Sequence, residues 1–262
     1  MAAGLVAVLT LAGCVSARTA NVPMSALSLP GSDPRSRCAV VFLPGRWDHP
    51  ADFTAEGFPT AAAEQGAHVA MVAADAGLQY YLGGTVVERL ERDIVAPLRA
   101  AGHDRVWLVG VSMGGLGALL TLRRHSDQVT GVVVLAPFLG DRKVVREIVD
   151  GGGLATWSPP ESLSPDDYQR RLWTWLKTET GPGPSPPIWL AYGEQDKLAT
   201  SAGLLAARLP TARVFTTEGG HDWRTWRRLW GSFLASGVLQ HSCKEPAPTV
   251  PAAGSESAGG SP

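Results

Sequence analysis

The sequence predicts an α/β fold in which a mostly parallel sheet is flanked by helices and carries a small inserted helical cap. Short apolar runs, typical of strands that are buried on both faces, alternate along the chain with segments whose apolar residues recur at helical spacing. Such alternation indicates βαβ units and therefore parallel strands. In addition, residues 141–186 are too many for a simple crossover between two strands, which predicts the inserted cap.

Six strands are predicted from the apolar runs, the first of which stops at Pro44-Gly45. In chain order the predicted strands cover residues 38–43, 67–73, 105–111, 131–136, 187–192 and 213–217.

Helices are predicted between these strands. After the second strand, Glu88 and Arg92 can pair on the outer face of a crossover helix whose other face carries Val86, Val87, Leu90, Ile94, Val95 and Leu98. Similar patterns occupy residues 116–124, 202–209 and 223–234. The cap is rich in large side chains, namely Trp157, Tyr168, Leu172, Trp173, Trp175 and Leu176.

The composition excludes several classes of protein. The chain has 262 residues, 45% of them hydrophobic, which suits one domain of ordinary size. Its formal net charge is −1 and no long basic run occurs, so a nucleic-acid partner is not expected. The three cysteines are too scattered for a zinc site, and we expect no structural metal.

The N-terminal residues 1–17 contain an apolar run, from Leu5 to Leu11, that is too short to cross a bilayer but suits a signal peptide. The run ends in Leu11-Ala12-Gly13-Cys14, which resembles the bacterial lipobox, so Cys14 would become a lipidated N-terminus. No Lys or Arg precedes the run, and an uncleaved leader is the alternative. The expected location is the bacterial cell envelope, either lipid-anchored or secreted.

The remaining boundaries follow from composition. Residues 18–37, rich in Ser, Pro and Ala, are predicted to be a flexible linker, and residues 244–262 a disordered tail. Between them lies the folded domain, residues 38–243, with the cap insertion at 141–186. Cys38 and Cys243 flank this domain and either form a disulfide or remain two thiols, because the sequence gives no distance between them.

The clearest motif is Gly110-Val111-Ser112-Met113-Gly114, which matches G-x-S-x-G and lies between a predicted strand and a predicted helix. A sharp turn there exposes the Ser112 hydroxyl as a nucleophile, and the N–H of Met113, at the helix N-terminus, can stabilise an oxyanion. The plainer reading is a glycine-rich turn without chemistry. A phosphate-binding loop is disfavoured because no Gly-Lys-Ser/Thr follows.

A serine nucleophile needs a base, and the base needs a third group to orient it. Asp196 follows the fifth predicted strand and His221 follows the sixth, so the order along the chain is Ser, Asp, His. Glu194 competes with Asp196 as the acid, whereas Asp222 is adjacent to the histidine and is poorly placed to reach its Nδ1.

The other five histidines have simpler interpretations. His49 shares a loop with Asp48 and Asp52, where a metal or substrate contact is conceivable, although a solvated loop is favoured. The rest lie at the edges of predicted strands or helices: His68, His103, His125 and His241.

The segment after the first strand is expected to supply a second oxyanion donor, because Gly45 lets the backbone approach a substrate and the next N–H belongs to Arg46. The Arg46 side chain would meet an acidic substrate group or pair with Asp48 or Asp75, and we favour the salt bridge. Candidates for an apolar acyl pocket, each individually more typical of a core, are Trp47, Tyr80, Tyr81, Phe138 and the cap tryptophans.

Together the motifs around Gly45, Ser112, Asp196 and His221 resemble the α/β-hydrolase superfamily, especially its esterases and lipases, over residues 38–240 or so. The resemblance implies the α/β-hydrolase fold, no cofactor, an acyl-enzyme intermediate and a small-molecule carboxylic ester or thioester as substrate. A peptidase or acyltransferase with the same three residues, or a catalytically silent binding protein, remains an alternative. The chain departs from the family pattern in its short domain, its lack of a His-Gly-Gly-Gly segment and the apparent lack of initial antiparallel strands.

Overall fold

The computed structural model of the protein describes residues 20–180 and 187–244. The signal segment with Cys14 and all but the first residue of the predicted C-terminal tail lie outside these described residues. Within them, no helix is both long enough and apolar enough to cross a membrane.

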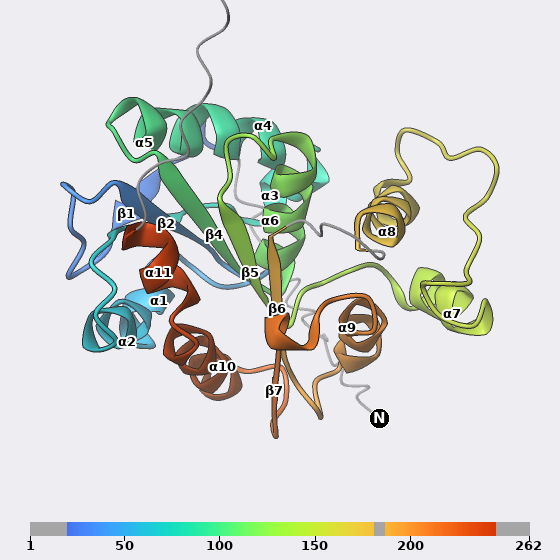
Figure 1. The fold of residues 1–262 in the computed structure, drawn as a ribbon. Coiled ribbons are helices and arrows are strands. Elements are labelled where there is room, and N and C mark those ends of the chain that lie inside the picture. The colour runs from blue at the N-terminus through green and yellow to red at the C-terminus, as the bar shows by residue number, and fades with distance from the viewer. Residues whose placement is uncertain (1–19, 181–186, 245–262) are drawn as a thin grey trace, which may run out of the picture.

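The described residues form a seven-stranded sheet in the order β1-β3-β2-β4-β5-β6-β7 (Figure 1). All neighbouring strands run parallel except β1, which is antiparallel to β3. The fold class predicted from the sequence is thereby confirmed. The strands are β1 (Ala26–Ser28), β2 (Cys38–Leu43), β3 (Ala70–Ala74), β4 (Arg105–Val111), β5 (Gly131–Leu135), β6 (Ile188–Gly193) and β7 (Val214–Thr217).

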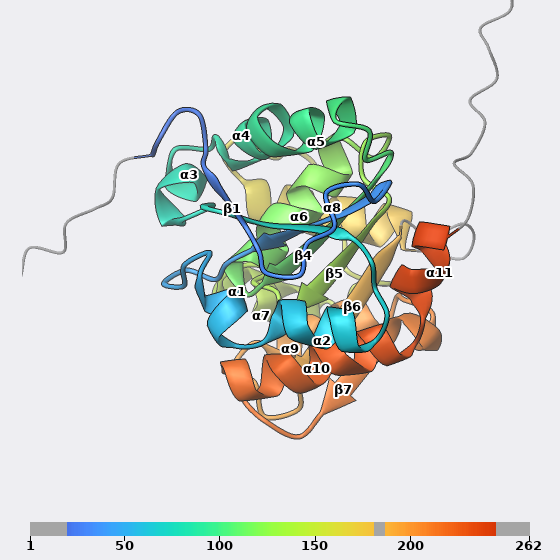
Figure 2. The same ribbon diagram turned by 90° about the vertical axis from the view of Figure 1, so that its left-hand side faces the viewer.

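Helices cover both faces of this sheet (Figure 2), which is why every residue of β2, β4 and β5 is buried. One face packs against α1 (Asp52–Ala55), α2 (Phe58–Glu64), α10 (Trp223–Ala235) and α11 (Val238–Lys244). The other face packs against α3 (Leu78–Leu82), α4 (Val86–Leu90), α6 (Met113–Arg124) and α9 (Ala199–Ala206). The 3₁₀ turn η2 (Thr211–Arg213) leads into β7.

The predicted crossover helix is present, but it contains a π-helical turn, η1 (Glu91–Val95), between α4 and α5 (Ala96–Ala100). Pro97 follows this turn and has no N–H to donate to the carbonyl of Asp93, so regular α-helical hydrogen bonding cannot continue there. The predicted pair of Glu88 and Arg92 is formed, with 3.2 Å between the charged atoms.

The predicted flexible linker at 18–37 is wrong for its described residues. Residues 26–28 form β1, an initial antiparallel strand that the sequence did not indicate, and the side chains of Met24 and Leu29 are buried. The N–H of Met24 donates to Asp93 Oδ2 at 2.7 Å, and that of Leu29 to the carbonyl of Met71 at 2.9 Å. The segment has no apolar period of its own. Contacts with β3 and η1, which are distant in sequence, hold it in place.

A disulfide joins Cys38 at the start of β2 to Cys243 in α11, with 5.5 Å between the two Cα atoms. Of the two alternatives for these cysteines, the structure contains the disulfide. It links the first central strand to the last helix across 205 residues of chain.

The cap insertion contains α7 (Arg142–Asp150) and α8 (Tyr168–Glu179). Its large side chains complete the hydrophobic core on the α6 face of the sheet, because Trp157 and Trp173 are buried together with Leu172 and Leu176. Trp157 Nε1 donates to Glu147 Oε1 at 3.1 Å, which satisfies the one polar atom of that ring. These cap tryptophans therefore belong to the core.

Candidate active site

Ser112 lies in a sharp turn between β4 and α6, with φ 52° and ψ −111°. This left-handed conformation is costly for any residue other than glycine and persists only where the surroundings enforce it. The flanking glycines are required because a Cβ at Gly110 would lie 2.2 Å from the carbonyl oxygen of Gly114, and a Cβ at Gly114 would lie 2.1 Å from that of Leu43. The G-x-S-x-G spacing is thus a packing requirement of this turn.

The structure brings Ser112, His221 and Asp196 into one hydrogen-bonded chain. His221 Nε2 lies 2.9 Å from Ser112 Oγ, and His221 Nδ1 lies 2.9 Å from each oxygen of Asp196. The three residues follow β4, β6 and β7, whose carboxyl ends share one edge of the parallel sheet. The three candidates are therefore in mutual contact.

The Asp196 side chain is fully buried, whereas the His221 side chain is 12% exposed. The N–H of Leu198 donates to Asp196 Oδ1 at 2.7 Å. This hydrogen bond orients the carboxylate, which can hold the imidazole in one tautomer with Nδ1 protonated. The Trp226 ring meets the His221 ring edge to face at 5.0 Å and fixes it from the side.

The two competing acids lie elsewhere. Glu194 is exposed. Asp222 caps α10 by accepting the N–H of Thr225 at 2.8 Å, and this bond lowers the pKa of the Asp222 carboxyl. Asp222 therefore has a structural role at the start of α10.

The two predicted oxyanion donors belong to segments next to Ser112. Met113 is the first residue of α6, where a backbone N–H has no acceptor within the helix. The loop after β2 passes close by, because a Cβ at Gly45 would lie 3.5 Å from Ser112 Cβ. Within residues 20–180 and 187–244, no backbone acceptor is bonded to the N–H of Arg46 or of Met113.

The Arg46 side chain does not form the expected salt bridge with Asp48 or Asp75 in the described part of the chain. Its guanidinium lies over the Trp47 ring, 4.8 Å from the centroid. Trp47 itself is 67% exposed. A cation on an aromatic face at the surface replaces the predicted ion pair.

Sequence reasoning assigned no role of its own to Asp48, which lies in the loop that passes Ser112 at Gly45. Trp223 Nε1 donates to Asp48 Oδ1 at 3.2 Å. Burial raises the pKa of the Asp48 carboxyl and the charge of Asp52 adds to this, against the opposing effects of the Trp223 hydrogen bond and of His221. Its position next to Gly45 was the available signal, but the contact with Trp223 spans 175 residues and has no local pattern.

The remaining pocket candidates separate into two groups. The N–H of Phe138 donates to the carbonyl of Ser112 at 2.9 Å, so Phe138, like Trp47, belongs to a loop beside Ser112. Tyr80 is buried and its hydroxyl donates to the carbonyl of Asn21 at 2.8 Å. The Tyr81 hydroxyl packs over Gly117, and burial raises its pKa. Tyr80 is therefore a core residue.

His49 is exposed, and its N–H donates to Asp52 Oδ2 at 2.7 Å, which orders the start of α1. Among the residues that the structure describes, no group of three or more His, Cys, Asp or Glu side chains is placed to hold a metal ion.

A parallel sheet covered by helices on both faces, with a strained serine between a central strand and a helix, defines the class of α/β hydrolases. The chain belongs to the alpha/beta hydrolase family, whose pattern residues 40–258 match. No curated protein is similar enough in sequence to match the chain.

Solved structures share the fold at low sequence identity. A ferulic acid esterase is 18% identical with a TM-score of 0.53, over 78% of this chain and 86% of that one. Est1E from Butyrivibrio proteoclasticus, with ferulic acid bound, is 16% identical with a TM-score of 0.54, over 84% and 96% of the two chains. A monoacylglycerol lipase from Paleococcus ferrophilus is 17% identical with a TM-score of 0.52, over 81% and 98%.

Proposed function

We propose that the protein is a serine hydrolase that cleaves a carboxylic ester or thioester through an acyl-enzyme intermediate. Ser112 is the nucleophile, His221 the general base and Asp196 the residue that orients the histidine. The observation that carries this proposal is the unbroken chain of 2.9 Å contacts from Ser112 Oγ through the His221 ring to the buried Asp196 carboxylate. Family membership supports a hydrolase, and the three side chains supply its chemistry.

In the proposed mechanism His221 Nε2 accepts the proton of Ser112 as Oγ attacks the substrate carbonyl carbon. The negative charge that develops on the carbonyl oxygen is stabilised by the N–H groups of Met113 and Arg46. The carbon–oxygen or carbon–sulfur bond then breaks, and His221 returns the proton to the leaving alcohol or thiol. Water, deprotonated by His221, attacks the acyl-enzyme and releases the acid and Ser112.

Small-molecule esters are the substrates that the surroundings of Ser112 favour. Ser112 and His221 are only half-buried, and Trp47 and Phe138 offer apolar surface on the adjacent loops. The fold is shared with proteins named as a ferulic acid esterase and a monoacylglycerol lipase, which act on esters. We extend that substrate class to this chain as part of the proposal.

The proposal is tested by labelling with a fluorophosphonate probe and by turnover of p-nitrophenyl esters of increasing chain length. The wild type should be labelled once and should release p-nitrophenol, whereas Ser112→Ala should do neither. Ser232→Ala, which removes an exposed hydroxyl on α10, is the matched control and should retain both activities. Failure of the wild type to react would favour the silent binding protein, and transfer of the acyl group to added alcohols or amines in preference to water would favour an acyltransferase.

We also propose, from Leu11-Ala12-Gly13-Cys14, that the protein is anchored in the cell envelope by lipid on Cys14. A diacylated cysteine holds a protein at a bilayer far more firmly than a single acyl chain does. Cys14→Ser should therefore move the protein from the membrane fraction to the soluble fraction without changing ester turnover. Fractionation identical to that of the wild type would contradict the anchor and leave the proposed catalysis intact.

A further inference from the structure

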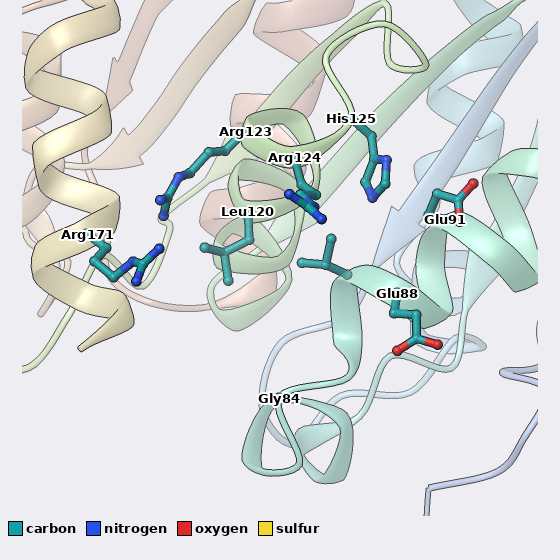
Figure 3. Close-up of a pocket in the computed structure, with 9 residues that line it drawn as sticks. Gly84, Glu88, Glu91, Leu120, Arg123, Arg124, His125 and Arg171 are labelled. Carbon is teal, nitrogen blue, oxygen red and sulfur yellow. The ribbon is translucent and has the colours of Figure 1, made fainter. Parts of the chain in front are cut away.

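A cavity of about 670 Å³ opens on the α6 face of the sheet, between α4, η1, the end of α6 and α8. Figure 3 shows the basic side chains that line it: Arg123, Arg124 and His125 at the end of α6, and Arg171 from α8. The opposite wall carries Glu88 and Glu91. The cavity holds none of the residues assigned to catalysis.

Arg123 and Arg171 bring two positive charges to the same part of the cavity. Arg123 and Arg171 come from different helices, and in Figure 3 both side chains extend into the space between α6 and α8. Both are half-buried, and neither forms an ion pair with another residue in the described ranges. Burial lowers the pKa of the Arg123 guanidinium, and the positive charge of Arg171 lowers it further.

Neither carboxylate on the cavity wall, Glu88 or Glu91, forms an ion pair with Arg123 or Arg171 in the described ranges. Glu88 already interacts with Arg89 and with Arg92, each at 3.2 Å. In the cap, Glu147 and Asp167 form ion pairs with Arg170. These two carboxylates therefore neutralise Arg170 and not the adjacent Arg171.

The negative end of the α6 dipole accounts for part of this arrangement. Cations in the last turn of a helix are favourable, which suits Arg123 and Arg124. The dipole of α6 gives no reason for α8 to bring a third guanidinium, Arg171, to the same place. Two like charges held together at a partly buried site are costly unless an anion lies between them.

We propose that this cavity binds a phosphate group, either of a free phosphate compound or of a lipid headgroup, between Arg123 and Arg171. The planar guanidinium presents paired N–H donors that match phosphate oxygens, and such charge-assisted bonds are the strong ones. The site is separate from catalysis, because α6 has 12 residues and its two ends are thus roughly 17 Å apart, with Ser112 at the other end.

One feature favours a lipid as the source of the phosphate. The hydroxyl of Tyr80 in α3 donates to Asn21, and Asp93 in η1 accepts from Met24. The N-terminal described residues thus lie on the same layer of helices as the cavity. An anchor preceding them would bring this layer toward a membrane surface.

The test uses the full chain with Cys14→Ser, so that no acyl chain contributes to binding. This chain serves as the wild type at the cavity and is compared with the double variant Arg123→Gln/Arg171→Gln. Pyrophosphate binding is measured by calorimetry at low ionic strength, and sedimentation is measured with phosphatidylcholine vesicles with and without phosphatidylglycerol. Arg227→Gln, which removes an exposed charge from α10 in the other helical layer, is the matched control. Arg171→Gln alone and the melting temperature of each variant show whether loss of binding reflects misfolding.

We expect the double variant to bind at least about tenfold more weakly than the wild type, and the Arg227→Gln control to be unchanged. Loss of pyrophosphate binding alone identifies a free phosphate compound as the ligand, and loss of binding to phosphatidylglycerol vesicles identifies a lipid headgroup. Equal binding by the wild type and a folded double variant in both assays, or an equal loss in the Arg227→Gln control, overturns the proposal. Ester turnover is not expected to change in any of these variants, so the outcome is independent of the proposed catalysis.

Discussion

Trp223 Nε1 donates a 3.2 Å hydrogen bond to Asp48 Oδ1, and this bond joins the loop after β2 to the segment that carries His221. The Trp223 ring is also held edge to face by Phe53 and Phe58, at 5.4 and 5.6 Å. The proposed oxyanion donor at Arg46 and the proposed base are therefore positioned by one shared contact.

We expect Asp48→Ala to loosen this contact. The Trp223 N–H would lose its acceptor in a partly buried site, which costs about 1–3 kcal/mol of stability. Ester turnover should fall by roughly tenfold, because the loop carrying Arg46 would be less well held. Urea unfolding and kcat/KM of the variant check both effects, and an unchanged kcat/KM would show that the bond does not position the site.

Asp48→Asn is the companion variant, since it keeps the acceptor oxygen and removes the charge. The folded-state pKa of Asp48 lies above its ordinary value of 3.8, chiefly because of burial. The folded state therefore binds the proton more tightly, and the free energy of unfolding of the wild type falls as the pH rises from 3.8 to the folded-state pKa. We expect the stability of Asp48→Asn relative to the wild type to increase over that interval and then to stay constant toward neutral pH. Unfolding curves measured from acid to neutral pH check this, and a difference that does not change with pH would contradict it.

The proposed role of Asp196 in orienting His221 is tested by a pair of variants. Asp196→Asn should lower kcat by roughly four orders of magnitude, because an amide cannot hold His221 in the required tautomer. Glu194→Gln should leave the rate nearly unchanged, because Glu194 is exposed and Asp196 supplies both oxygens at 2.9 Å from His221 Nδ1. Steady-state ester hydrolysis measures both, and the reverse ranking would move the acid to Glu194.

The close packing of the turn around Ser112 predicts how substitution of its glycines changes the stability of the fold. Gly114→Ala should destabilise the fold by several kcal/mol or abolish it, since the new Cβ would lie 2.1 Å from a backbone oxygen that cannot move freely. Gly231→Ala is the control, because Gly231 lies inside α10 and the added methyl group would have no atom within 4 Å. Alanine there should stabilise the protein by about 0.5–1 kcal/mol. Thermal unfolding of the two variants should thus show shifts of opposite sign.

The cap is expected to be essential for folding. Trp173 is fully buried, so Trp173→Ala should cost about 3–5 kcal/mol, whereas Trp175→Ala, at a partly buried position, should cost less. Deletion of residues 143–182 would expose the same core and should cause early melting or aggregation, with loss of activity on short and long esters alike. A folded deletion variant with normal thermal stability would contradict this role of the cap.

The sequence predicted those parts of the molecule that carry a local pattern. The strand Arg105–Val111 and the following helix were found because a continuous apolar run meets a helical period at G-x-S-x-G. The order Ser112, Asp196, His221 was found because each residue follows a predicted strand, and the structure places all three in contact.

The parts that were not predicted depend on contacts between distant residues. Strand β1 was assigned to the linker because the segment is rich in Ser, Pro and Ala and has no apolar period. The three residues of the strand are all exposed, and the strand is stabilised by pairing with β3. The salt bridge expected for Arg46 is replaced by contact with its neighbour Trp47, a choice between two local partners that composition does not decide. The disulfide and the bond from Trp223 to Asp48 span 205 and 175 residues, and no local pattern reports such distances.

If Cys14 carries the proposed lipid, the ordered segment before β2 limits how far the domain can move from a membrane. Had residues 18–37 been a free linker, the domain could have drifted tens of ångströms from an anchor at Cys14. Because Asn21 and Met24 are bonded to α3 and η1, only the six peptide steps from Cys14 to Ala20 separate the proposed lipid from the domain, a reach of roughly 20 Å at full extension. A protein held by so short a tether would encounter esters that lie in or next to the bilayer at a much higher local concentration than esters dissolved in the surrounding medium.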